Sequence, residues 1–221
     1  MVDVFKLTIP QLTGDEERTA YVYSPEGVSE PCPVLYMFDG QNLFFDSTAS
    51  FGKSWGLLKY LEETGLPLIV ASVACNTHPE SYHLGGRFSE YSPFSFHDDR
   101  FGDIKGRGEI TMEWLINEFK PLIDSRYRTL PDRQHTFIGG SSMGGLMSLY
   151  AVSAYNRVFS RAAALSPSVM LTDCRIIPLI RRTDYAPGTV VYMDVGQEEE
   201  DGEDGRDGEE QREPAVGLHR A

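Results

Sequence analysis

Hydrophobic residues in this chain are grouped in two ways, as short unbroken runs and as helical periods. The runs are rich in Val, Ile and Leu, and they occur at 33–40, 66–74, 135–140, 161–168 and 189–196. Such runs are typical of strands buried on both faces of a parallel sheet. Two earlier segments, 4–12 and 18–26, alternate apolar and polar residues, which predicts an antiparallel strand pair with one solvated face.

Helical periods separate most of these runs. Residues 55–65 place Leu57, Leu58 and Leu61 on one side of a helix that stops at Gly65. Residues 109–127 predict a longer helix that Pro121 kinks or divides, with apolar positions at Ile110, Trp114, Leu115 and Phe119. Residues 143–155 and 174–182 predict two more. Strands that alternate with helices imply right-handed crossovers and an α/β fold with a doubly wound, mostly parallel sheet.

Two segments lack either pattern. Residues 75–108 have no clear period and many Gly, Pro and aromatic residues. Because they follow a central strand, we expect them to lie at the ligand-binding edge of the sheet and to face substrate, although a purely decorative loop is the alternative. Residues 197–221 have almost no apolar content before Val216 and are expected to be disordered. The predicted division is a domain at 1–196 and an acidic tail at 197–221.

Charge excludes one class of partner. The formal net charge is −13, and residues 197–221 carry ten acidic side chains against three arginines. More than half of the imbalance therefore belongs to the tail, and the body is only mildly acidic. Binding to nucleic acid requires clustered Lys and Arg, so we do not expect it.

Cysteines, hydropathy and acidic spacing add further expectations. The three cysteines are scattered, which predicts free thiols in a reducing cytoplasm. No apolar run approaches the roughly 20 residues that span a bilayer, and the N-terminus lacks a signal-peptide pattern. Asp98, Asp99 and Asp103 lack the spacing of a calcium loop, so neither a metal nor a cofactor is expected.

The stretch FIGGSSMGGLMSLYAV at 137–152 carries the candidate chemistry. Gly140-Ser141-Ser142-Met143-Gly144 fits the pattern G-x-S-x-G with Ser142 at its centre. An apolar strand precedes it and a helix follows it, as a nucleophile elbow requires. Small flanking residues allow a sharp turn, and the helix N-terminus favours a developing oxyanion. A tight glycine turn that only packs helix on strand is the alternative.

Several further stretches together resemble the putative esterase family of α/β-hydrolases. They are VLYMFDGQNLF, KPLIDSRYRT, GGSSMGG, FSRAAALSPS and YMDVGQEE, and the resemblance covers roughly residues 15–200. That family includes feruloyl and other carbohydrate esterases, S-formylglutathione hydrolase, trilactone siderophore esterases and mycolyl transferases. The shared stretches do not separate these substrate classes.

The resemblance implies roles for particular residues. Ser142 would be the nucleophile, and the main-chain N–H groups of Gln41 and Met143 would form the oxyanion hole. Glu199, in Gly196-Gln197-Glu198-Glu199, would be the acid of the triad, with Asp194 and Glu198 as the alternatives. We also expect Gly40 and Arg87 to contribute to substrate binding.

The catalytic histidine is harder to place. In this fold the order along the chain is Ser, acid, His. Only His219 follows Glu199, and no strand or helix pattern surrounds it, so it is a poor candidate. His135 opens the strand whose far end carries Ser142. The remaining histidines, in the irregular segment, are His78, His83 and His97.

The abrupt change to acidic sequence after the run at 189–196 indicates that the last strand and helix of the family are missing. We interpret the C-terminal part as lost or replaced, and a frame change in the coding sequence would produce such a junction. The predicted function is hydrolysis of a small or carbohydrate-linked carboxylic ester through an acyl-enzyme on Ser142, with low turnover. The alternatives are a catalytically inactive remnant that binds a ligand, and an acyltransferase. The oligomeric state is left open.

Overall fold

A computed structural model describes residues 1–77, 86–99 and 102–196. The strands are β1 (Val2–Thr8), β2 (Glu17–Tyr23), β3 (Val34–Met37), β4 (Ile69–Val73), β5 (Phe96–Asp98), β6 (Gly102–Ile104), β7 (Thr136–Ser141), β8 (Arg161–Leu165) and β9 (Val190–Asp194). The helices are α1 (Pro10–Thr13), α2 (Leu57–Thr64), α4 (Gly86–Glu90), α5 (Gly108–Trp114), α6 (Lys120–Arg126), α7 (Met143–Ala154) and α8 (Ile176–Arg182). All five apolar runs contain a strand, as predicted.

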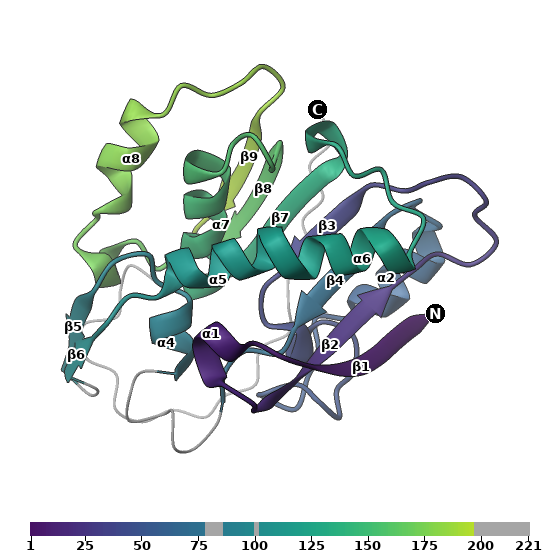
Figure 1. The fold of residues 1–221 in the computed structure, drawn as a ribbon, viewed down its shortest axis with the longest axis horizontal. Helices are drawn as coiled ribbons and strands as arrows, with labels where there is room; N and C mark the ends of the chain where they lie inside the picture. The colour runs from purple at the N-terminus through teal and green to yellow at the C-terminus, as the bar shows by residue number, and fades with distance from the viewer. Residues whose placement is uncertain (78–85, 100–101, 197–221) are drawn as a thin grey trace.

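The main sheet has seven strands in the order β1-β2-β4-β3-β7-β8-β9 (Figure 1). The pairs β1–β2 and β2–β4 are antiparallel, whereas every other neighbouring pair is parallel. From β3 the chain continues to β4 on one side of β3 and then to β7 on its other side, so the sheet is doubly wound. The predicted fold class is therefore confirmed, including the antiparallel strand pair at the N-terminus.

Both faces of the central strands are covered. Along β2, Ala20 and Val22 belong to the larger hydrophobic core, while Tyr21 and Tyr23 belong to a second core on the opposite face. Helix α2 closes the second core with Leu57, Leu58 and Leu61, the apolar side that the sequence predicted. Helices α5, α6, α7 and α8 contribute to the larger core.

The helix at 109–127 is divided into two α-helices just before Pro121, as predicted, but it is not broken. Figure 1 shows α5 and α6 as one continuous rod. A π-helical turn, Leu115–Phe119, lies between them. A wider turn immediately before Pro121 is one way to accommodate the hydrogen bond that proline cannot make. Ile110 is 38% exposed, whereas Met112 is fully buried.

Residues 75–108 contain more regular structure than expected. They hold α4 and a two-stranded antiparallel hairpin, β5–β6. These short elements gather at one end of the sheet (Figure 1). The prediction that they lie at an edge near the candidate chemistry is tested by the contacts of Arg87, described below.

The part of the chain that the structure describes includes no helix long and apolar enough to cross a bilayer. All three cysteines are free, with Cys32 and Cys75 buried, as the sequence predicted.

Candidate active site

Ser142 lies at the junction between β7 and α7. Its backbone has φ 56° and ψ −119°, a conformation that non-glycine residues rarely adopt. The main-chain hydrogen bonds hold the turn: Ser142 N–H donates to the Leu165 carbonyl at 2.9 Å, and Leu146 N–H donates to the Ser142 carbonyl at 3.0 Å. Ser142 is exposed. The predicted strand–turn–helix geometry around this serine is present.

Glycines allow the turn to pack closely. A Cβ on Gly140 would lie 2.8 Å from the carbonyl carbon of Gly144, and a Cβ on Gly144 would lie 3.0 Å from the Cβ of Phe38. A Cβ contact of 2.8 Å essentially never occurs in proteins, and one of 3.0 Å requires the neighbouring atom to shift. The glycines therefore bring the start of α7 against both β7 and the chain that follows β3.

The loop after β3 is the second part of the site. Asp39 has left-handed backbone dihedrals, φ 60° and ψ 51°, and Gly40 begins a 3₁₀ turn, Gly40–Asn42. A Cβ on Gly40 would lie 2.7 Å from Ser72 Oγ, so this close approach to β4 requires glycine. Phe38 N–H donates to the Gly139 carbonyl at 2.9 Å, which ties the loop to β7. Two of the predicted contributors, Gly40 and Gln41, are thus held beside the elbow.

Gln41 is buried and fixed through its side chain. Its Oε1 accepts a hydrogen bond from the Cys75 N–H at 3.0 Å, and its Nε2 donates to Cys75 Sγ at 3.1 Å. Burial, and then the charge of Asp39, raises the pKa of the Cys75 thiol to about 12. This thiol therefore stays protonated at neutral pH and is an inert neighbour rather than a nucleophile.

Arg87 binds Asp39 rather than standing free in the site. Its Nε and Nη2 each donate to one carboxylate oxygen of Asp39 at 2.7 Å. Nη2 also lies 3.4 Å from the Ser141 carbonyl oxygen. Burial lowers the pKa of Arg87, but the hydrogen bonds and charge of Asp39 outweigh it, so the pKa lies above its ordinary value. The irregular segment does reach the candidate site, as its position predicted.

Ser168 is a site neighbour that the sequence did not indicate. Its hydroxyl and that of Ser142 are 2.9 Å apart, within hydrogen-bonding distance. Its N–H also donates to the Ser142 carbonyl at 3.1 Å. The predicted strand at 161–168 ends at Leu165, because Ser166 takes a positive φ of 40°. That turn directs the chain back toward Ser142, which no strand or helix pattern reveals.

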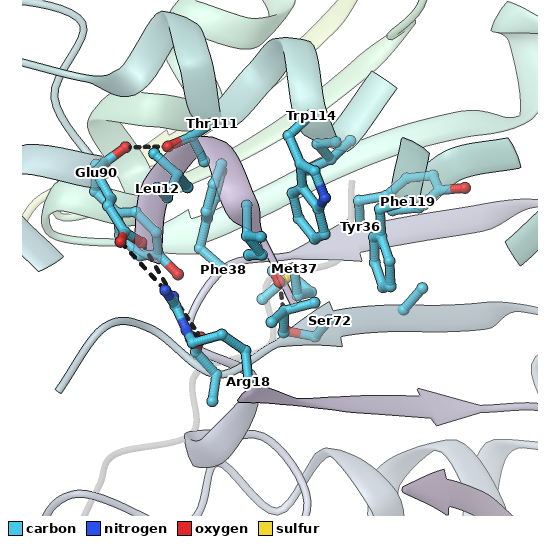
Figure 2. Close-up of a pocket in the computed structure, with 16 residues that line it drawn as sticks. Leu12, Arg18, Tyr36, Met37, Phe38, Ser72, Glu90, Thr111, Trp114 and Phe119 are labelled. Carbon is cyan, nitrogen blue, oxygen red and sulfur yellow. Dashed lines mark hydrogen bonds and ion pairs between the residues drawn. The ribbon is translucent and has the colours of Figure 1, made fainter. Parts of the chain in front are cut away.

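A groove opens beside Ser142. It has a volume of about 640 Å³ and lies between the loop after β8 and the end of β9. The residues that line it carry no charge: Ser142, Ser166, Pro167, Ser168, Val169, Met170, Leu171, Met193 and Val195. A second, much smaller cavity of about 30 Å³ lies in the core (Figure 2), large enough for only one or two water molecules.

The two histidines that the structure describes, His135 and His97, pair with aspartates and not with Ser142. His135 lies before β7, at the strand end opposite Ser142 as predicted, and its Nδ1 lies 2.8 Å from Asp132. His97 is exposed on β5, where a hydrogen bond with Asp103 raises its pKa. Neither of them hydrogen-bonds Ser142. His78, His83 and His219 lie outside the described residues.

Of the predicted acids, Asp194 lies within the described residues. Glu198 and Glu199 lie outside the described residues, together with the whole of the predicted acidic tail. Asp194 ends β9, where its side-chain Oδ1 accepts a hydrogen bond from Ser166 N–H at 3.1 Å. Asp194 thus supports the turn that leads to Ser168.

Comparisons with known proteins agree with this geometry. The model of the putative esterase family matches residues 12–215. An uncharacterised protein, YbbA of Bacillus subtilis, is 28% identical over 170 residues, which are 76% of this chain and 62% of YbbA. The chain therefore spans less than two thirds of that relative.

Solved structures share the fold at low sequence identity. Siderophore hydrolase EstA from Aspergillus nidulans has a TM-score of 0.69 at 16% identity, with 94% of this chain and 73% of that chain covered. An IroE-like serine hydrolase from Shewanella oneidensis has a TM-score of 0.67 at 21% identity, with 87% and 60% covered. The BES protein from Bacillus cereus has a TM-score of 0.64 at 20% identity, with 89% and 74% covered. With its α/β-hydrolase sheet and a family match over most of its length, the chain belongs to the putative esterase family.

Proposed function

We propose that this protein is a carboxylic-ester hydrolase that works through an acyl-enzyme on Ser142. The observation that carries the proposal is the exposed Ser142 hydroxyl at a positive φ, directly before the N-terminus of α7. A serine in this position can reach a bound carbonyl, and the first amides of the helix can stabilise the negative oxygen that forms.

The reaction would proceed in two steps. Ser142 Oγ attacks the ester carbonyl carbon while a base takes its proton, and the main-chain N–H groups of Gln41 and Met143 hold the oxyanion. The leaving alkoxide takes a proton as the ester bond breaks. Water then attacks the acyl-enzyme, which releases the carboxylic acid and restores the Ser142 hydroxyl.

The base and its orienting acid are proposed from the order of residues along the chain. Glu199 is proposed to orient a histidine, and His219 is the one histidine that follows it in the sequence. Within the described residues, Ser142 Oγ has a hydroxyl neighbour, Ser168, instead of an imidazole. Without an aligned base a serine is a weak nucleophile at neutral pH. We therefore propose slow turnover for this chain.

The substrate is proposed to be a small or carbohydrate-linked ester that is uncharged near the reacting carbonyl. Support comes from the groove beside Ser142, whose lining residues carry no charge and include Met170, Met193 and Val195. Gly40 and Arg87 are proposed to border the substrate on the opposite side. Structures with the same fold include a siderophore hydrolase and a ferulic acid esterase, which supports an ester as the substrate.

Covalent labelling with an uncharged fluorophosphonate tests the proposal. The reagent phosphonylates an activated serine, so we expect slow labelling that mass spectrometry maps to Ser142 and not to Ser141. Ser142→Ala should abolish labelling, whereas Ser125→Ala, which removes a hydroxyl at the end of α6, should not. The absence of labelling in the wild-type chain would contradict the proposal.

A second candidate function is ligand binding without catalysis. The contact between Ser142 and Ser168 hydroxyls favours it, because no described imidazole stands at the nucleophile. Saturable binding of an uncharged ester without labelling or hydrolysis would support this alternative. Rapid hydrolysis of activated phenyl esters that Ser142→Ala abolishes would exclude it.

A further inference from the structure

Asp39 has an unusual backbone conformation, and its side chain pairs with Arg87. It lies in the left-handed region, immediately before the Gly40–Asn42 turn, and its side chain is only 5% exposed. Arg87 meets both carboxylate oxygens with two parallel N–H bonds of 2.7 Å. This fork geometry is stronger and more directional than a single ion pair. Asp39 lies two residues before Gln41, so its dihedrals contribute to the orientation of the Gln41 main-chain N–H.

The same guanidinium also reaches the nucleophile elbow. Arg87 Nη2 lies 3.4 Å from the carbonyl oxygen of Ser141, the residue that precedes Ser142. One side chain therefore bridges the loop after β3 and the end of β7. These are the two segments that carry the proposed oxyanion donors, Gln41 and Met143.

The helix that carries Arg87 is held in place by buried contacts. Arg87 belongs to α4, whose last residue, Glu90, is 2% exposed and pairs with the buried Arg18 of β2 at 3.0 Å. Figure 2 shows the Arg18 guanidinium bonded directly to the Glu90 carboxylate beside the small core cavity, with Thr111 bonded to the Glu90 backbone carbonyl. Arg18 Nη2 also donates to the Ala74 carbonyl, which follows β4, at 2.8 Å. The short helix is thus anchored to the sheet by a buried charge pair.

Tyr91 completes the support. The Arg87 guanidinium lies 5.1 Å from the centre of the Tyr91 ring. The Tyr91 hydroxyl oxygen accepts a hydrogen bond from Asp39 N–H at 3.2 Å. Both the backbone and the side chain of Asp39 are therefore held by neighbouring residues, Arg87 and Tyr91.

We propose that Arg87 is a positioning residue that fixes the Gln41 amide relative to the Met143 amide through Asp39. This inference rests on the proposed function. An oxyanion hole accelerates a reaction when its donors are oriented before the charge develops. Because the Asp39 carboxylate balances its charge, Arg87 acts on the loop and not as a binding site for an anionic substrate.

The decisive experiment combines Arg87→Met, Arg87→Lys, Asp39→Asn and the double variant Arg87→Met/Asp39→Asn. The readout is the second-order rate constant for labelling by an uncharged fluorophosphonate, together with the thermal midpoint of each variant. Losing one oxyanion donor costs about 10²–10³-fold, so a displaced donor should cost about 10–100-fold in Arg87→Met. Arg87→Lys should recover part of that loss.

The double variant separates positioning from other roles. If Arg87 acts through Asp39, then Arg87→Met should slow labelling by less than about threefold in the Asp39→Asn background, because coupled residues are not additive. Lys59→Met, which removes a cation from an exposed pair on α2, is the matched control and should label like the wild type. A labelling rate in Arg87→Met equal to the wild type, or additive losses, would overturn the inference.

Hydrogen exchange distinguishes failure of this inference from failure of the proposed function. Arg87→Met should speed amide exchange in a peptide that covers residues 38–45, while the peptide that covers β4 stays protected. If the wild-type chain is not labelled, the proposed function fails. The amide exchange rate at residues 38–45 then remains as the test of whether Arg87 positions the loop. Unchanged exchange at 38–45 would overturn its positioning role in either case.

Discussion

Strands β4 and β9 come from sequence segments of the same kind but lie in opposite environments. Both are short apolar runs that run parallel to a neighbour in the same sheet. All five residues of β4 are buried, whereas all five residues of β9 are exposed. Val70 in β4 is 0% exposed, and Val191 in β9 is 43% exposed. Hydrophobicity alone therefore predicted the strand without predicting its burial.

Neighbours account for the difference. Strand β4 lies between β2 and β3 and has a hydrophobic core on each face. Among the described residues, strand β9 pairs with β8 alone and lies at the edge of the sheet (Figure 1). An exposed apolar edge presents unpaired backbone groups that can pair with another chain. An apolar run in the sequence thus determines that the backbone is extended. The neighbouring elements of the tertiary structure determine whether the strand is buried.

The same substitution in both strands should give the largest contrast. Val70→Asp places an unpaired charge in a fully buried position and should lower the free energy of unfolding by more than about 4 kcal/mol. Val191→Asp leaves the charge in water and should cost less than about 1 kcal/mol. Urea denaturation of the two variants measures both values. Similar losses would show that β9 is as well covered as β4.

Alkaline pH should weaken the fold in part through a buried thiol just beyond β4. Burial raises the pKa of Cys75, just beyond β4, from 9.0 to about 12, so the folded chain holds this proton more tightly than the unfolded chain. The stabilisation is complete below pH 9 and is lost as the pH rises toward 12, at up to about 1.4 kcal/mol per pH unit.

Urea denaturation at pH 8 and pH 10.5 tests this dependence. Cys75→Ala should lose less stability over that interval than the wild type, because one group that must stay protonated has been removed. Ser125→Ala removes a hydroxyl at the end of α6 and serves as the control, with the wild-type dependence on pH. An identical pH dependence for Cys75→Ala would contradict the burial argument.

The smallest change in stability should come from a lysine at the edge. Val190→Lys in β9 should alter the free energy of unfolding by less than about 0.5 kcal/mol, because the side chain is 52% exposed. It should nevertheless reduce concentration-dependent self-association, since lysine on an edge strand opposes pairing with a second chain. Light scattering measures the association. Val28→Lys, a similar exposed valine outside any strand, should leave it unchanged.

Much of the fold was predictable because it depends on local patterns. The apolar runs, the amphipathic side of α2 and the glycine-flanked turn at Ser142 are each encoded within about ten residues. One prediction failed, because Ile110 was placed on the apolar side of the helix at 109–127 and is 38% exposed, whereas Met112 is fully buried. Pro121 did not break that helix, because a π-helical turn precedes it.

The candidate site was only partly predictable. Ser142 follows from the motif and Met143, Gly40 and Gln41 from the family resemblance; they lie at the junction of β7 with α7 and in the turn after β3. The roles of these residues, and those of Glu199 and a histidine, stay predictions. Ser168 and the pairing of Arg87 with Asp39 depend on residues 26 and 48 positions apart, and no sequence period links such positions.

The backbone conformation of Ser142 lowers the stability of the fold at the same residue that carries the candidate nucleophile. A non-glycine side chain at φ 56° costs of order 1–3 kcal/mol, and the conformation persists only because surrounding contacts hold it. Glycine at this position would relieve that cost and give a more stable chain, but it would remove the hydroxyl. Selection for stability alone would therefore replace this serine, and a lineage that retains it preserves the capacity for chemistry at the expense of its fold.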